Sequence, residues 1–201
     1  MLSNIKSTYF VDIIFSFVDE EQKLKIVKCN KSLQQNINIS IINYKLFKGK
    51  YIKYASNGIG IEYLGFNNQI VFKGEYLNGK RNGKGKEGDN FGEIIFEGEY
   101  LNGKRNGKGK EYFDRKLYFE GEYLNGKRNG KGKEYYNNIL IYEGEFSDGR
   151  RNGKGKEYCL SGYKKYEGEY LDGLKHGKGK RYDDKGNFEF EGKYLYGVKQ
   201  I

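Results

Sequence analysis

The chain has 201 residues, of which 36% are hydrophobic and 16% aromatic, and its formal net charge is +10. The hydrophobic share is too low to fill a thick two-layer core, whereas the aromatic share and the regular pattern argue against a disordered chain. The 37 basic residues favour anionic partners, but 27 acidic residues dilute the effect.

We expect neither a signal peptide nor a membrane span. The longest apolar stretch, Phe10 to Val18, is broken by polar residues and is too short to cross a bilayer. Cys29 and Cys159 lie far apart in the sequence, so they indicate neither a disulfide framework nor a metal site. A reducing compartment, and therefore a cytoplasmic location, is the expectation.

Residues 1–45 contain no glycine and predict a small α-helical cap. Two short helices are expected, over residues 10–18 and 19–31, with Asp19 as the cap of the second. The stretch from Ile14 to Val18 and the helix after it resemble an F-box, although the usual leading Leu-Pro is missing. That resemblance implies binding to the linker subunit of a ubiquitin ligase. Alternatively, or in addition, the cap covers the open edge of the first hairpin.

Residues 46–201 consist of about seven units of 23 to 25 residues, the last one truncated. Fixed-period similarity of this length is typical of an array in which each unit buries its apolar face against its neighbours. Each unit has a glycine at one fixed place, here called the anchor. The anchors are Gly49, Gly74, Gly98, Gly121, Gly144, Gly168 and Gly192.

Each anchor lies between two aromatic residues, as in Phe72-Lys73-Gly74-Glu75-Tyr76. Because side chains alternate along a strand, the two rings and the glycine share one face. We therefore predict a strand with one aromatic side, and an aromatic groove along the array. The predicted groove residues are Phe72, Tyr76, Phe96, Tyr100, Phe119, Tyr123, Tyr142, Phe146, Tyr166 and Tyr170.

An Asn-Gly or Asp-Gly turn follows each of these strands, for example at Asn78-Gly79, and indicates a hairpin. The second strand has glycines nine and eleven residues after the anchor, as at Gly83 and Gly85, and we expect aromatic rings to lie over them. Hairpins in series predict a mainly β fold, a single-layer antiparallel meander. Each unit would advance it by about 10 Å, with the aromatic face on the concave side.

The stretch Tyr142-Glu143-Gly144-Glu145-Phe146, followed by Asp148-Gly149 and Gly153-Lys154-Gly155, resembles a MORN repeat. This name stands for "membrane occupation and recognition nexus". The pattern recurs in register five times, from Gly74 to Gly179, and the flanking units depart from it, as array ends often do. The resemblance implies a non-catalytic β-meander that contacts proteins, self-associates or attaches to anionic phospholipid membranes.

Basic residues follow each hairpin turn and would align along one edge of the sheet. Several acting together could hold an anionic partner, at about 1 kcal/mol per side chain near a membrane. The alternative is a solvated edge that only adds solubility. This predicted basic rim consists of Lys80, Arg81, Lys104, Arg105, Lys127, Arg128, Arg150, Arg151 and Lys175.

No catalytic, cofactor-binding or metal-binding residues are predicted. His176 occupies a turn position that holds Asn in the other units, and the loop Gly79–Lys84 lacks the Ser/Thr and helix of a phosphate-binding loop. Recurrent acidic residues and rings already engaged with glycine disfavour nucleic acid.

We therefore predict a non-enzymatic binding or scaffolding module with a protein partner, whose array would recruit substrates if the F-box-like segment binds a ligase. Peripheral attachment to an anionic membrane is the alternative.

Overall fold

The computed structural model describes residues 45–47, 50–55, 57–64 and 68–200. The predicted helical cap with its F-box-like segment lies outside the described residues, apart from Lys45 at the start of the first strand. Everything described belongs to one mainly β array, and it contains no helix.

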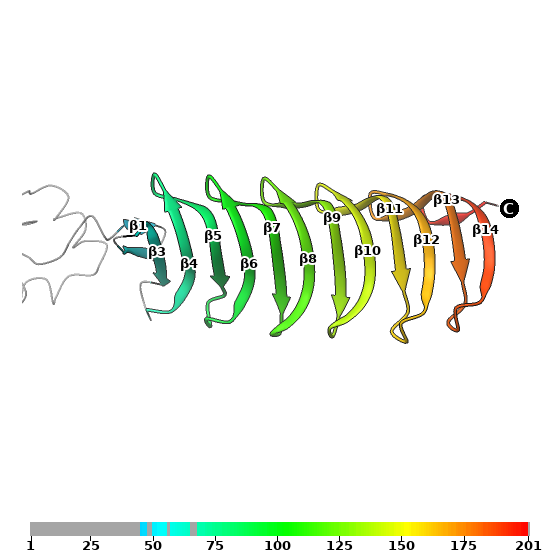
Figure 1. The fold of residues 1–201 in the computed structure, drawn as a ribbon, viewed down its shortest axis with the longest axis horizontal. Helices are drawn as coiled ribbons and strands as arrows, with labels where there is room; N and C mark the ends of the chain where they lie inside the picture. Colours follow the sequence, from blue (N-terminus) through cyan, green and yellow to red (C-terminus); the bar gives the residue numbers. More distant parts are fainter. Residues whose placement is uncertain (1–44, 48–49, 56, 65–67, 201) are drawn as a thin grey trace, which may run out of the picture.

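All the strands form a single open antiparallel sheet in which spatial order equals chain order (Figure 1). This confirms the predicted meander of hairpins. The 15 strands are β1 (Lys45–Phe47), β2 (Lys50–Tyr54), β3 (Ile59–Leu64), β4 (Ile70–Leu77), β5 (Lys80–Gly88), β6 (Ile94–Leu101), β7 (Lys104–Phe113), β8 (Lys116–Leu124), β9 (Lys127–Tyr136), β10 (Ile139–Ser147), β11 (Arg150–Tyr158), β12 (Lys164–Leu171), β13 (Leu174–Tyr182), β14 (Phe188–Leu195) and β15 (Val198–Lys199).

Tight turns close each hairpin at the predicted positions. Asn78 and Gly79 join β4 to β5 with φ angles of 50° and 73°, and the later Asn-Gly and Asp-Gly pairs repeat this geometry. Two residues with positive φ match the twist of the flanking strands, and Asn and Gly adopt that conformation at low cost. The turn residues thereby set the register, which brings anchor Gly74 opposite Gly85.

Pairs of facing glycines leave the space that the aromatic rings of the core occupy. In the hairpin of β8 and β9, Gly121 faces Gly132, and a Cβ on Gly132 would lie 2.5 Å from Cζ of Phe119. Phe119 is fully buried, and its ring meets Tyr123 of its own unit and Phe146 of the next edge-on, at centroid distances of 5.7 and 5.1 Å. The edge-to-face contact between units recurs along the array and joins neighbours in a core one ring thick.

The two glycines of each second strand have different roles, which the sequence pattern did not separate. Gly85 lies under the ring of Phe72, as predicted. Gly83 instead has a φ of 97° and packs against the carboxylate of Glu75, beside an irregularity in the β4–β5 register. A side chain at position 83 would meet both an unfavourable backbone conformation and the Glu75 side chain.

The ring-on-glycine packing predicts a large difference between two phenylalanines of neighbouring strands. Phe119 is fully buried, whereas Phe113 is 77% exposed. We expect Phe119→Ala to lower the free energy of unfolding by about 3–5 kcal/mol, because it leaves a cavity over the glycines. Phe113→Ala should change it by less than about 0.5 kcal/mol. Urea unfolding followed by circular dichroism measures both, and similar losses would contradict the packing described here.

Candidate functional site

The two faces of the sheet differ because successive side chains point to opposite sides. One face carries the aromatic rings. The other carries lysines and glutamates on either side of a central row of glycines, and it forms an open groove of about 1600 Å³ from Ile59 in β3 to Lys178 in β13. Backbone forms the floor of this charged groove, because the glycine Cα–Cβ directions point at the rings.

Ten lysines and nine glutamates line the charged groove, so its net charge is close to zero. They stand in two rows, and in each row lysine and glutamate mostly alternate from strand to strand. The linker-side row lies nearer the connections between units and includes Lys86 and Glu97, which face each other across β5 and β6. The turn-side row lies nearer the hairpin turns and includes the facing pair Lys84 and Glu99.

Ion pairs and hydrogen bonds neutralise much of the linker-side row. Lys86 lies 3.1 Å from Glu97, and Lys110 lies 3.4 Å from Glu120. The Tyr135 hydroxyl also donates to Glu120 at 2.6 Å, and this hydrogen bond lowers the pKa of that carboxyl group. Tyr135, near the end of β9, therefore fixes the position of a carboxylate in the linker-side row.

The residues predicted to line an aromatic groove form the buried core instead. Nine of the ten rings are at most 4% exposed, and Tyr76 packs against them as a partly buried neighbour. The open groove lies on the opposite face, where the lining is lysine, glutamate and glycine backbone. The rings therefore hold the units together, and charged side chains line the open groove.

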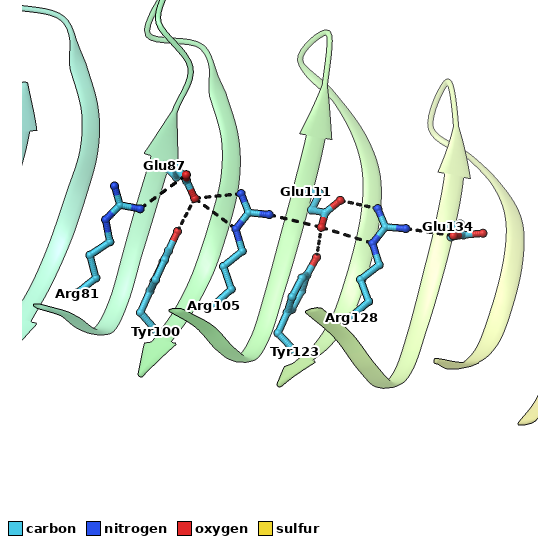
Figure 2. A network of polar contacts seen from close by, with 8 residues as sticks. All are labelled: Arg81, Glu87, Tyr100, Arg105, Glu111, Tyr123, Arg128 and Glu134. Atoms are coloured by element: carbon cyan, nitrogen blue, oxygen red, sulfur yellow. Dashed lines mark hydrogen bonds and ion pairs between the residues drawn. The ribbon is translucent and has the colours of Figure 1, made fainter. Parts of the chain in front are cut away.

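A ladder of ion pairs closes the aromatic face (Figure 2). The guanidinium carbon of Arg128 lies 4.2 Å from the centroid of the Phe119 ring. The same guanidinium bridges Glu111 of the preceding unit at 2.5 Å and Glu134 of its own unit at 3.1 Å. The hydroxyl of Tyr123 donates to Glu111 at 2.8 Å. The ring thus lies over the glycines, and a row of alternating arginines and glutamates covers the rings.

The glutamates of this ladder were not singled out from the sequence. They stand thirteen residues after the anchor, near the end of the second strand of each unit. A signal was available, since an arginine recurs seven residues after the anchor in four successive units. The ladder glutamates are Glu62, Glu87, Glu111, Glu134 and Glu157.

The structure divides the predicted basic rim into two sets. Arg81, Arg105, Arg128, Arg151 and Lys175 lie in the ladder, with side chains 15–24% exposed. The other four remain on the exposed edge at the hairpin turns. They are Lys80 and Lys104, Lys127 with an ion pair of 2.9 Å to Asp148, and Arg150 with one of 3.9 Å to Asp172.

The remaining candidate side chains do not gather into a reactive site. His176 packs against Tyr196, and Cys159 donates to Asp184 at 3.3 Å in a setting where burial raises the pKa of the thiol. In the part of the chain that the structure describes, no group of three metal-ligating residues occurs, and no helix is long and apolar enough to cross a membrane.

The repeat pattern matches a known family. The family model for the MORN repeat matches five segments, residues 72–89, 96–115, 119–138, 142–162 and 166–188, which make up about half of the chain. The chain belongs to the MORN-repeat family. No curated protein sequence matches it.

Two of the solved structures similar to it are crystal structures of TarM. One is a mutant TarM of S. aureus in complex with Fondaparinux, alpha-GlcNAc-glycerol and UDP, at 11% identity and a TM-score of 0.34. The other is TarM at 10% identity and a TM-score of 0.26. The matches cover 74% of this MORN chain but only 32% and 25% of the TarM chains.

The ladder shifts the pKa values of Glu62 and Glu111 and of the tyrosines that donate to them. Burial by itself would raise the pKa of Glu111, but hydrogen bonds from Arg128 and Tyr123 outweigh it and hold the pKa below its ordinary value. Glu62 has a lowered pKa on the same balance, with Arg81 and Tyr76 as its donors. Burial and the neighbouring carboxylates raise the pKa of Tyr123 and Tyr76. Glu62 and Glu111 therefore stay charged, and Tyr76 and Tyr123 stay neutral, at physiological pH.

The lowered glutamate pKa values make the MORN array sensitive to acid. The ladder's contribution to stability is complete above the unfolded pKa of about 4.3 and is lost as pH falls through the lower folded pKa. We expect Glu111→Gln to lower the free energy of unfolding at pH 7 by about 1–3 kcal/mol and to make its decline between pH 5 and pH 2 shallower.

Glu191 is the matched control, because its side chain is 59% exposed in a surface pair with Lys180. Glu191→Gln should show the same dependence of the free energy of unfolding on pH as the wild-type protein. Urea unfolding at a series of pH values distinguishes the cases, and identical curves for Glu111→Gln and wild type would contradict a stabilising ladder.

Proposed function

We propose that this MORN array is a non-catalytic binding or scaffolding module that holds a protein partner in the charged groove. The observation that carries the proposal is the continuity of the groove, which runs across strands β3 to β13 with the same lining in each unit. A surface repeated in this way suits a long ligand better than a small substrate. MORN-family membership supports a binding role, and the proposal includes no cofactor.

The contrast between the two faces also supports the groove as the binding surface. On the aromatic face, the rings are buried and the arginines are committed to ion pairs within the array. In the groove, mostly exposed lysines and exposed or half-buried glutamates surround a floor of glycine backbone, so a partner can approach the sheet closely.

Bulky side chains in the middle of the groove test the proposal. Lys131 and Lys133 line the groove on β9, whereas Lys116 and Lys127 lie exposed at the two edges of the sheet. With the intact chain as bait, Lys131→Trp with Lys133→Trp should reduce recovery of the captured partner at least about tenfold, roughly 1.4 kcal/mol. Lys116→Trp with Lys127→Trp should leave recovery unchanged. If only the edge variant reduces recovery of the partner, the binding surface is not the charged groove.

Peripheral attachment to an anionic membrane is the second candidate function, and the edge at the hairpin turns favours it. Leu77, Leu101 and Leu124 are 59%, 50% and 51% exposed there, and they face Lys80, Lys104 and Lys127 across the hairpins. Apolar side chains beside basic ones form the kind of surface that lies in the headgroup region of a bilayer. The edge therefore provides an attachment surface separate from the groove.

Liposome sedimentation tests the membrane candidate without breaking the ladder. A variant with Leu77, Leu101, Lys80 and Lys104 changed to Ser should lose binding to phosphatidylserine vesicles, and wild-type binding should weaken as salt rises. The ladder arginines are kept, because their removal would destabilise the fold. Absence of binding, or salt-independent binding equal in both proteins, would eliminate this candidate.

A further inference from the structure

We propose that the turn-side row of the charged groove recognises an extended acidic peptide that carries Asp or Glu at every third residue. This inference rests on the proposed function of the groove and adds the chemistry and the spacing of the ligand. The row contributes one lysine per unit over five successive units. These lysines are Lys84, Lys108, Lys131, Lys154 and Lys178.

The ammonium groups of these five lysines have no ion pair or hydrogen bond with any residue that the structure describes, and the side chains are exposed. In the linker-side row, by contrast, three of the five lysines that line the groove have carboxylate partners, Lys86 at 3.1 Å, Lys110 at 3.4 Å and Lys156 at 3.8 Å. Two rows with the same residue types therefore differ in how much positive charge they leave available to a ligand.

The difference arises from where the turn-side glutamates place their carboxylates. Lys84 and Glu99 face each other across β5 and β6, but the Glu99 carboxylate packs against Gly107 on the next strand instead. Glu145 packs in the same way against Gly153, where its carboxylate accepts a hydrogen bond from the backbone N–H of Lys154 at 2.8 Å. The positive-φ glycines thus hold the glutamates away from the lysine ammonium groups.

The spacing of the lysines selects the conformation of the ligand. One lysine occurs on every second strand, so neighbouring ammonium groups repeat at about 9.6 Å along the groove. A polyproline II helix has three residues per turn and advances about 9.3 Å per turn, with residues i and i+3 on the same side. An acidic residue at every third position would therefore meet each lysine in turn, with an accumulated mismatch of only about 1 Å over four intervals.

The intervening glutamates make the site selective. A glutamate stands on the strand between successive lysines of the row, about 4.8 Å along the sheet from each, so a ligand with a denser series of negative charges also meets repulsion. Uniform polyanions and anionic membrane surfaces are disfavoured for this reason. A peptide with period three places its charges over the lysines and leaves neutral residues over the glutamates.

Synthetic peptides test the spacing directly. The first has five Glu-Pro-Ala triplets. Two others have the same composition, one with the five glutamates contiguous and one with them at every second position. By fluorescence anisotropy with the full chain, we expect the triplet peptide to bind at least about tenfold more tightly than either control. Equal affinities for the three peptides would overturn the inference.

Matched lysine variants test which row of the groove binds the triplet peptide. Lys108→Gln, Lys131→Gln and Lys154→Gln together should weaken triplet-peptide binding at least about tenfold and reduce its salt dependence. Lys86→Gln, Lys110→Gln and Lys156→Gln together remove the same charge from the paired row and should change binding less than about twofold. Equal losses in the two variants would show a general charge effect and overturn the inference. Circular dichroism confirms that both variants fold.

Partner capture by the two groove variants distinguishes failure of this inference from failure of the proposed function. If the tryptophan variant of Lys131 and Lys133 abolishes partner capture while the Lys108, Lys131 and Lys154 glutamine variant does not, the groove binds the partner but the period-three inference is wrong. If neither variant affects capture, both proposals fail. Vesicle binding that depends on the same three lysines would also overturn the inference, in favour of a lipid ligand.

Discussion

An aromatic ring that lies across two facing glycines holds each hairpin together, and the rest of the array depends on this contact. A single-layer sheet has no second layer to cover its apolar side chains, so the rings must be buried by what the sheet itself provides. Glycines let the Phe119 ring reach the backbone, and Phe146 of the next unit covers its edge. The outward surface of the ring still needs a cover, and Arg128 supplies it.

The need to cover the rings explains why each unit contains a ladder. A guanidinium group over a ring is half-buried and needs partners, so Arg128 pairs with Glu111 of the preceding unit and with Glu134 of its own unit. The pair with Glu111 crosses the boundary between two units and adds to the ring contacts that already join them. Cooperativity along the array therefore arises from hydrophobic and ionic contacts that both join neighbouring units.

The sequence allowed much of the fold to be predicted but less of the site. Alternation at Phe72, Gly74 and Tyr76 indicated a one-sided strand, and the Asn-Gly turns indicated hairpins in register. The direction of the Arg81 side chain could not be predicted from the sequence, because a long side chain beside a turn can point to solvent or fold back over a ring. Gly83 and Gly85 look equivalent in sequence, and only the local irregularity in register separates the glycine under a carboxylate from the glycine under a ring.

The same irregularity links stability to recognition. At Gly83 the backbone takes a positive φ, and Glu75 packs against it, with its carboxylate 3.2 Å from the Lys84 N–H. A residue with a Cβ at that position would displace the glutamate, and a displaced glutamate could pair with the neighbouring lysine. The glycine therefore sets the charge pattern of the groove although it carries no charge itself. Because the arrangement recurs in every complete unit, a ligand meets a series of cations whose period is fixed by the strands of the sheet and not by flexible side chains.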